Sequence, residues 1–177
     1  GLSTTDDKRF LRLWFEVSTN KTSLYEGYDI ISNNTTWVPI TKGGSYRKWY
    51  GNMEFIVNWE NNGYLLKHES NAVLRNFSLY FKSDGYSWCE VAIGKPSFRF
   101  VRKDWLFNNK GPVCIPNDFK PNNSLLGFLN SIVTYKFLEL LSPTISFNSG
   151  AIGSLPFKNK TIKYIDTLVS QNISISR

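Results

Sequence analysis

The chain has 177 residues, of which 41% are hydrophobic and 20% charged, a composition that indicates a folded globular domain and excludes a disordered chain. Lys and Arg total 21 against 14 acidic residues, giving a net charge of +7, and this balance favours a polyanionic partner such as nucleic acid. No stretch is long and apolar enough to span a bilayer. Because the sequence opens at Gly1 without a methionine, we expect a fragment of a longer protein.

The first predicted element is a helix over residues 6–17, DDKRFLRLWFEV, because its apolar residues recur at spacings of three and four. Thr5 or Asp6 is the expected N-cap. Arg9 and Arg12 share a neighbouring face at positions i and i+3. The sequence leaves two roles open for this pair: contact with phosphates, or an ordinary solvated face.

Residues 18–36 are polar and rich in Asn, so a loop is expected there, with one short strand allowed at 24–28. A short extended piece follows at 37–40, where Pro39 permits only an edge strand or a strand end. A strand is predicted over 54–59 because apolar residues alternate along it.

The chain is organised around Lys42–Gly63, KGGSYRKWYGNMEFIVNWENNG. Two glycines open it, three cations and three aromatics fall within nine positions, and Asn61–Gly63 supply a turn. Cations meet phosphates and aromatic rings stack on bases, so this cluster suits a nucleic-acid surface. The alternative is solvated cations beside core aromatics. The predicted DNA contacts here are Lys42, Tyr46, Arg47, Lys48, Trp49, Tyr50 and Asn52.

After one or two helical turns at 64–71, strands are predicted at 88–93 and 97–102, joined by a hairpin turn at 94–96. Phe98 and Phe100 are expected to point inward and Arg99 outward, on the opposite face of its strand. A second basic cluster, again predicted to contact DNA, consists of Arg99, Arg102 and Lys103. A further short strand is expected at 113–115.

A polar linker at 117–123 leads to the strongest predicted helix, residues 124–141. Its broad apolar face predicts a buried helix, and Pro143 ends it. Gly127 and Ser131, small residues at i and i+4, predict close packing against a neighbouring element. A loop-rich return at 145–157 and a final amphipathic helix at 162–169 complete the chain. The residues of the expected buried face are Leu125, Leu129, Ile132, Val133, Phe137, Leu140 and Leu141.

Catalytic and metal chemistry have no recognisable motif in this sequence. It lacks a dinucleotide-binding fingerprint, a P-loop and a G-x-S-x-G nucleophile motif. His68 is the single histidine, and Cys89 and Cys114 have no C-x-x-C spacing, so neither a zinc site nor a catalytic triad is expected. A reduced intracellular cysteine pair is favoured over a disulfide. We therefore predict no catalytic residue and no metal ligand, and interpret the chain as a binding module.

Several stretches resemble the target-recognition region of bacterial adenine methyltransferases of the BREX phage-defence type (PglX) and of related type IIG restriction–modification enzymes. The block KGGSYRKWYGNMEFIVNWENNG is similar to the family pattern K-G-G-x-x-R-K-W-Y-G-N-x-E-Y-V-V-N-W-x-N-D-G. DDKRFLRLW resembles D-N-x-R-F-L-R-x-W, with Asp7 where that pattern often has Asn. LLGFLNSIVTYKFLELLSPTISFNSGAIGSLPF resembles the family's L-G-x-L-N-S helix, its P-T-x-x-F turn and its G-x-I-x-x-L-P exit.

The resemblance implies the specificity half of such an enzyme. The motifs that bind S-adenosylmethionine and hold the flipped adenine are absent, so no cofactor is expected in this chain and both motifs belong to the parent enzyme. The implied partners are double-stranded DNA, the methyltransferase domain of the same parent chain, and other phage-defence proteins or a phage DNA-mimic inhibitor. The implied location is the bacterial cytoplasm, with no membrane partner.

Together these features predict a mixed α/β (α+β) fold for a single DNA target-recognition domain over residues 1–177, with a twisted sheet of short strands, a buried helix near 124–141 and helices at both ends. A rival interpretation is an extracellular glycan-binding or other non-catalytic interaction domain, since aromatics stack on sugars. The rival also draws on seven N-x-S/T sequons, at Asn20, Asn33, Asn34, Asn76, Asn122, Asn159 and Asn172.

Overall fold

The computed structural model describes residues 1–23, 36–75, 81, 83–116, 122–158 and 161–177. The strand expected at 24–28, most of the linker expected at 117–123, and four of the sequon asparagines lie outside these residues. The helices are α1 (Asp7–Phe10), α2 (Glu60–His68), α3 (Asn123–Leu129), α4 (Ile132–Leu141), α5 (Ser149–Gly153) and α6 (Lys163–Ser176), with short 3₁₀ turns at Trp14–Glu16 and Thr19–Lys21. The strands are β1 (Leu2–Ser3), β2 (Leu11–Leu13), β3 (Trp37–Thr41), β4 (Phe55–Asn58), β5 (Val73–Leu74), β6 (Gly85–Ser87), β7 (Arg99–Val101), β8 (Leu106–Phe107) and β9 (Val113–Cys114).

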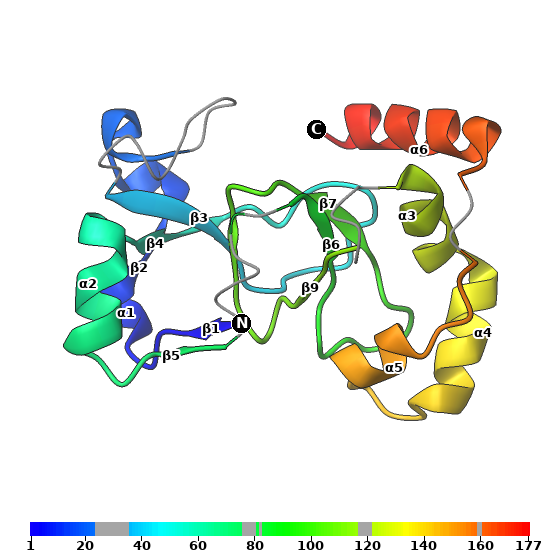
Figure 1. Cartoon of the computed structure of the whole chain (residues 1–177), viewed down its shortest axis with the longest axis horizontal. Helices are drawn as coiled ribbons and strands as arrows, with labels where there is room; N and C mark the ends of the chain where they lie inside the picture. Colours follow the sequence, from blue (N-terminus) through cyan, green and yellow to red (C-terminus); the bar gives the residue numbers. More distant parts are fainter. Residues whose placement is uncertain (24–35, 76–80, 82, 117–121, 159–160) are drawn as a thin grey trace.

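The strands form three small sheets, and the predicted mixed α/β class is confirmed. A four-stranded sheet has the order β2-β4-β3-β8, a three-stranded sheet the order β7-β6-β9, and β1 pairs with β5. In Figure 1 the four-stranded sheet lies with α1 and α2 on one side of the molecule, and α3–α6 gather on the other. We call these parts the N-terminal lobe and the C-terminal lobe.

Each lobe has its own hydrophobic core. The first core is built on the four-stranded sheet and includes Phe10, Val57 and Leu106. The second joins the three-stranded sheet to the helices and includes Trp88, Phe98 and Leu138. The chain crosses between the lobes several times, since β8 pairs with β3 whereas β9, a few residues later, pairs with β6.

The predicted helix over residues 6–17 is wrong beyond its first turn. Helix α1 covers only Asp7–Phe10, and Asp6 caps it by accepting a hydrogen bond from the Arg9 amide at 3.1 Å. The chain then enters β2, where Leu11 pairs with Val57. Strand pairing with β4 thus overrides the helical spacing, and it places Arg9 on a helix and Arg12 on a strand rather than on one helical face.

The strand expected at 37–40 is β3, but it lies between β4 and β8 and Pro39 is its middle residue, so the predicted edge or end position is wrong. Pro39 pairs with Ile56 on one side. On the other side the pairing with β8 begins only at Ile40. Proline lacks an N–H to donate, so it is tolerated where the second neighbour has not yet begun.

The turn predicted at 61–63 appears as left-handed backbone at the start of α2. Asn61, Asn62 and Gly63 have φ of 49°, 58° and 72°. A Cβ at Gly63 would lie 2.8 Å from the Trp59 ring, so glycine is needed both for conformation and for space. The helical turns expected after residue 64 follow directly.

The hairpin predicted from strands at 88–93 and 97–102 is wrong in its first strand and in its turn. β6 and β7 are antiparallel, with Gly85 opposite Val101, so the first strand precedes the predicted 88–93 and the connection is longer than 94–96. The outward orientation predicted for Arg99 is wrong, since its exposure is 2%. The strand expected at 113–115 is confirmed as β9.

The single buried helix predicted over 124–141 is two helices bent by 60°. Asn130 ends α3, and the Ser131 hydroxyl begins α4 by accepting a hydrogen bond from the Thr134 amide at 3.2 Å. The prediction of close packing is confirmed at Gly127, where a Cβ would lie 2.8 Å from Ile165 of α6. No single helix among the described residues is long and apolar enough to cross a membrane. The bent α3–α4 pair reaches the necessary length and apolar composition only when its two helices are counted together.

Candidate nucleic-acid interface

The loop between β3 and β4 carries most of the predicted DNA contacts, and its backbone repeatedly enters the left-handed region. Gly43, Gly44 and Gly51 have φ of 85°, 116° and 123°, and Trp49 and Asn52 also have positive φ. Glycine adopts these conformations without steric cost, whereas other residues must be held in them by contacts. The conformation of the loop is therefore determined by the contacts that hold its residues in place, which we call its anchors.

One set of anchors fixes the base of the loop. The Asn52 amide donates to the Ser45 carbonyl at 2.8 Å, and the Cys89 thiol donates to the Gly44 carbonyl with the sulfur 2.9 Å away. Asn52 is only 5% exposed. In this arrangement Asn52 closes the loop on itself, and its predicted contact with DNA stays a prediction.

Arg99 forms a buried support under the loop. Its guanidinium donates to the Arg47 carbonyl at 3.3 Å and to the Cys89 sulfur at 3.4 Å. Ser97 accepts from the same guanidinium at 3.5 Å and from the Arg47 amide at 3.2 Å. A side chain that reads a base must reach into a DNA groove, and Arg99 instead holds the main chain of Arg47 in place.

The segment after the loop tip is bound to the C-terminal lobe. The Trp49 amide donates to the Phe98 carbonyl at 2.9 Å, and the Phe100 amide donates to the Trp49 carbonyl at 2.8 Å. The Lys48 ammonium donates to the Asn130 carbonyl at 2.9 Å. Trp49 and Tyr50 pack against the second core. These aromatics therefore serve as partly buried anchors.

The tip of the loop, Ser45–Arg47, is left exposed by these anchors. Tyr46 is 59% exposed and Arg47 is also exposed. Within the described parts of the chain the Arg47 guanidinium has no hydrogen-bond or ion-pair partner, while its methylene stem runs so close to Gly51 that a Cβ there would lie 2.6 Å from Cδ. A free cation and an aromatic ring thus project from a fixed base.

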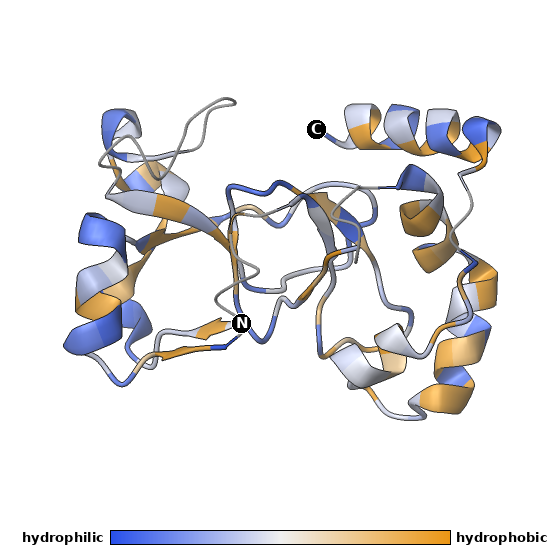
Figure 2. Ribbon diagram, viewed as in Figure 1, coloured by the Kyte–Doolittle hydropathy of each residue, from blue (hydrophilic) through white to orange (hydrophobic). Residues whose placement is uncertain are grey.

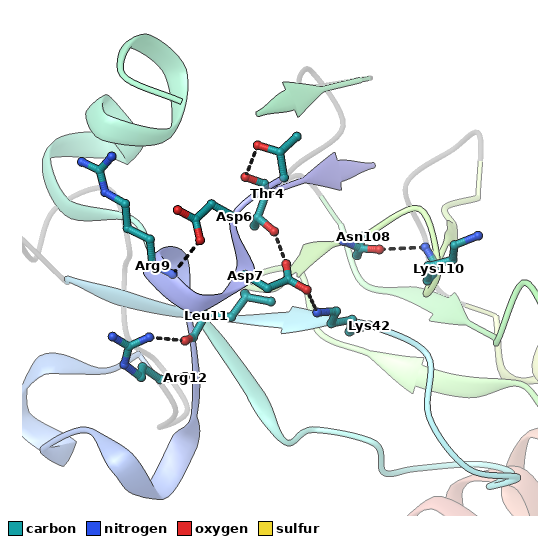
Figure 3. A network of polar contacts seen from close by, with 10 residues as sticks. Thr4, Asp6, Asp7, Arg9, Leu11, Arg12, Lys42, Asn108 and Lys110 are labelled. Atoms are coloured by element: carbon teal, nitrogen blue, oxygen red, sulfur yellow. Dashed lines mark hydrogen bonds and ion pairs between the residues drawn. The ribbon is translucent and has the colours of Figure 1, made fainter. Parts of the chain in front are cut away.

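Arg9, Arg12 and Lys42 form a separate group in the N-terminal lobe (Figure 3). Arg9 pairs with Glu69 at 3.4 Å, and Arg12 donates to the Lys8 carbonyl at 2.7 Å. Lys42 points toward Asp7 and forms an ion pair with it. All three predicted DNA contacts therefore have intramolecular partners.

Burial and neighbouring groups set the pKa of the Asp7 carboxylate. Burial favours the neutral acid, but hydrogen bonds from Lys42 and Thr4, together with the charge of Lys42, outweigh it and lower the pKa of Asp7 below its ordinary value of 3.8. The Asp7 carboxylate is consequently ionised near neutral pH.

Arg102 and Lys103 form a third group, beside β7. Arg102 binds the Asp104 carboxylate through two nitrogens, so its fork is occupied. Burial raises the pKa of Asp104, although Arg102 opposes that shift. Lys103 is exposed, and its main-chain amide donates to Asp84 at 2.8 Å.

The twelve predicted residues thus fall into three groups, and their local partners separate anchors from exposed side chains. That all twelve residues line one shared groove stays a prediction. Sequence reasoning missed Cys89, Ser97 and Asn130 as anchors because they lie 45, 50 and 82 residues from their loop partners. One local signal was present for Asn130: together with Ser131 it forms an Asn-Ser pair inside a predicted helix, and both residue types favour helix ends. Among the described residues there is no group of His, Cys, Asp and Glu suited to a metal, and both cysteines are free.

No protein-family model matches the chain. It is 33% identical over 183 residues to the adenine-specific methyltransferase PglX of Lacticaseibacillus casei (strain Zhang), a match that covers 100% of this chain and 15% of that protein. It is 36% identical over 172 residues to the adenine-specific methyltransferase BrxX of Escherichia coli O9:H4 (strain HS), which covers 95% of this chain and 13% of that protein. The chain therefore spans a small part of its curated relatives, and it is similar to a segment of two adenine-specific methyltransferases.

Proposed function

We propose that this chain is the DNA target-recognition module of an adenine-specific methyltransferase in bacterial phage defence. The observation that carries the proposal is the tip Ser45–Arg47, which projects from a loop anchored on both sides. Tyr46 is exposed there, and the Arg47 guanidinium has no partner among the residues that the structure describes. Such preorganisation suits base reading, because a side chain on a rigid support loses less entropy on binding. The relatives' names support the link to adenine methylation.

In the proposed division of labour, this module binds duplex DNA and the rest of the parent enzyme performs the chemistry. The S-adenosylmethionine site and the pocket for a flipped adenine would lie in the methyltransferase domain of the same polypeptide. Here Lys103 contacts a phosphate, while Arg47 contacts a guanine edge or a phosphate. Other phage-defence proteins, or a phage inhibitor that mimics DNA, would meet the same basic surface.

The burial pattern changes which arginine we expect to read a base. Arg47 and Arg99 were equal candidates by sequence, but only Arg47 has an exposed side chain. We propose Arg47 as the contact and Arg99 as the residue that positions it. The resemblance treats the Arg47 block as common to the family, so a phosphate is the alternative partner that the experiment must separate from a base.

Methylome sequencing of cells that carry the full methyltransferase decides between these contacts. Arg47→Ala should relax one position of the methylated motif if Arg47 reads a base, at a cost of roughly 1–3 kcal/mol, or reduce methylation at all sites alike if it binds phosphate. Lys136→Ala is the control, since it removes the same charge from a residue that pairs with Glu139 and is not a predicted DNA contact. A methylome unchanged by Arg47→Ala, at equal protein level, would remove the loop tip from the interface.

A further inference from the structure

Helix α4 presents the apolar face that the sequence analysis assigned to the core. Thr134 and Leu138, each 0% exposed, point inward. The apolar stripe, which we define as Val133, Phe137, Leu140 and Leu141, is exposed by 50%, 38%, 81% and 46%. These positions follow the spacing i, i+4, i+7 and i+8, so they occupy one side of the helix.

The exposure follows from how α4 is held. Its inner side is fixed by the Thr134 hydroxyl, which donates to the Phe128 carbonyl at 2.6 Å, and by Leu138 in the second core. The bend after α3 then turns the stripe away from the lobe. Figure 1 shows α4 at the outer edge of the molecule, and Figure 2 shows that much of this helix is hydrophobic.

Ile145, 58% exposed in the segment that follows α4, adds to the apolar surface at this end of the lobe. Single exposed apolar residues are normal, but a contiguous set on one helix marks an interaction surface. The apolar stripe therefore calls for a partner whose own surface is apolar.

We propose that the apolar stripe of α4 docks on another part of the same methyltransferase polypeptide. This chain spans 15% and 13% of its two relatives, so in a protein of that length most of the polypeptide lies outside it and is covalently tethered nearby. A tethered surface binds at high effective concentration, which favours it over a free partner. The stripe is then an interdomain contact that positions the module, and this inference does not depend on DNA recognition by the loop tip.

Hydroxyl-radical footprinting of the full methyltransferase polypeptide, without DNA, tests the proposal because the modification rate of a side chain follows its exposure to solvent. We expect Phe137 and Leu140 to be modified several-fold more slowly than their exposure in this chain implies, after correction for intrinsic reactivity. Tyr46 and Phe15, exposed by 59% and 65%, are internal references expected to react freely. Equal relative reactivity of the stripe and the references would overturn the proposal.

The oligomeric state separates the tethered partner from a second copy. Protection that persists in a sample shown to be monomeric by light scattering supports the intramolecular contact. Protection that appears only in dimers assigns the stripe to a copy of the same protein and overturns the proposal as stated.

A variant pair gives an independent readout. Val133→Glu with Leu140→Glu should raise the modification of Phe137 several-fold and speed proteolysis between this module and its neighbour. Phe15→Glu, a matched change in the N-terminal lobe, should do neither. If the double variant leaves both the footprint and the cleavage rate unchanged, the stripe is not a contact, and this result is distinguishable from any failure of the DNA-binding proposal.

Discussion

Asn130 binds both polar groups of the Phe98 main chain. Its Oδ1 accepts from the Phe98 amide at 3.0 Å and its Nδ2 donates to the Phe98 carbonyl at 2.8 Å. The same Phe98 carbonyl also accepts from Trp49. A residue at the bend between α3 and α4 thus fixes the segment before β7 and, through it, the candidate DNA-contact loop.

Asn130→Ala should destabilise the fold by about 1–3 kcal/mol, because the buried Phe98 amide loses its partner. Asn130→Asp keeps the acceptor but sets an oxygen against the Phe98 carbonyl, so it should be no better than alanine. Denaturant unfolding measures both, with Asn20→Ala at an exposed position as the control. Equal midpoints for Asn130→Ala and Asn20→Ala would show that the contact contributes nothing.

Three glycine substitutions separate backbone strain from crowding. Gly44→Ala introduces both strain and crowding, because φ is 116° and a Cβ would lie 2.8 Å from the Asn52 amide. Gly94→Ala introduces strain alone, because φ is 86° and the space around it is open. Gly153→Ala introduces neither. A left-handed backbone costs a residue other than glycine roughly 1–2 kcal/mol. We expect Gly44→Ala to be the most destabilising, Gly94→Ala intermediate and Gly153→Ala neutral or stabilising. Thermal unfolding checks this order, and a neutral Gly44→Ala would show that the loop base relaxes freely.

The Lys42–Asp7 ion pair should make stability depend on pH in the acid range. The pKa of Asp7 is lowered in the folded state, so the unfolded state binds its proton first as pH falls. The stabilisation is therefore fully present above the ordinary value of 3.8 and is lost as pH falls through the lowered pKa. Asp7→Asn should reduce this loss, by about 0.2–1 kcal/mol for so exposed a pair. Unfolding curves collected at a series of pH values measure this loss of stability, with Asp6→Asn as a neighbouring carboxylate control. Identical acid profiles for Asp7→Asn and the unmodified chain would show that the Lys42–Asp7 pair does not contribute to stability.

Local sequence patterns predicted the elements whose determinants are local. The alternation around Val57 marked β4, and Gly63 marked the turn at the start of α2, because each signal acts within a few residues. The helix predicted over 6–17 failed where Leu11 met Val57, a partner that periodicity does not reveal. The candidate site followed the same division: the glycine-opened loop is visible in the sequence, whereas the exposure of its tip and the burial of Arg99 depend on contacts with distant elements.

The outward face of α4 shows a second kind of failure. Apolar periodicity identifies which side of a helix avoids water, but it does not identify what covers that side. In this chain the core takes Thr134 and Leu138, and Phe137 and Leu140 remain at the surface. The pattern predicts burial against the rest of the chain, whereas the structure leaves that face exposed.

Three lysines that carry the same charge should differ in their effect on DNA binding by the full methyltransferase. Lys103 is exposed beside β7, Lys48 donates to the Asn130 carbonyl, and Lys136 pairs with Glu139 on α4 at 2.7 Å. A lysine that neutralises a phosphate releases counterions, so its loss lowers the slope of log affinity against log salt by roughly 0.9. We expect this reduction for Lys103→Ala. Lys48→Ala should weaken binding through loss of its anchor, with a smaller change in slope, and Lys136→Ala should alter neither affinity nor slope.

Titrations at several salt concentrations, with one target and one unrelated duplex, separate the cases. Lys103→Ala should reduce affinity for both duplexes alike, because phosphates carry no sequence information. Equal slopes for Lys103→Ala and Lys136→Ala would place Lys103 outside the DNA interface.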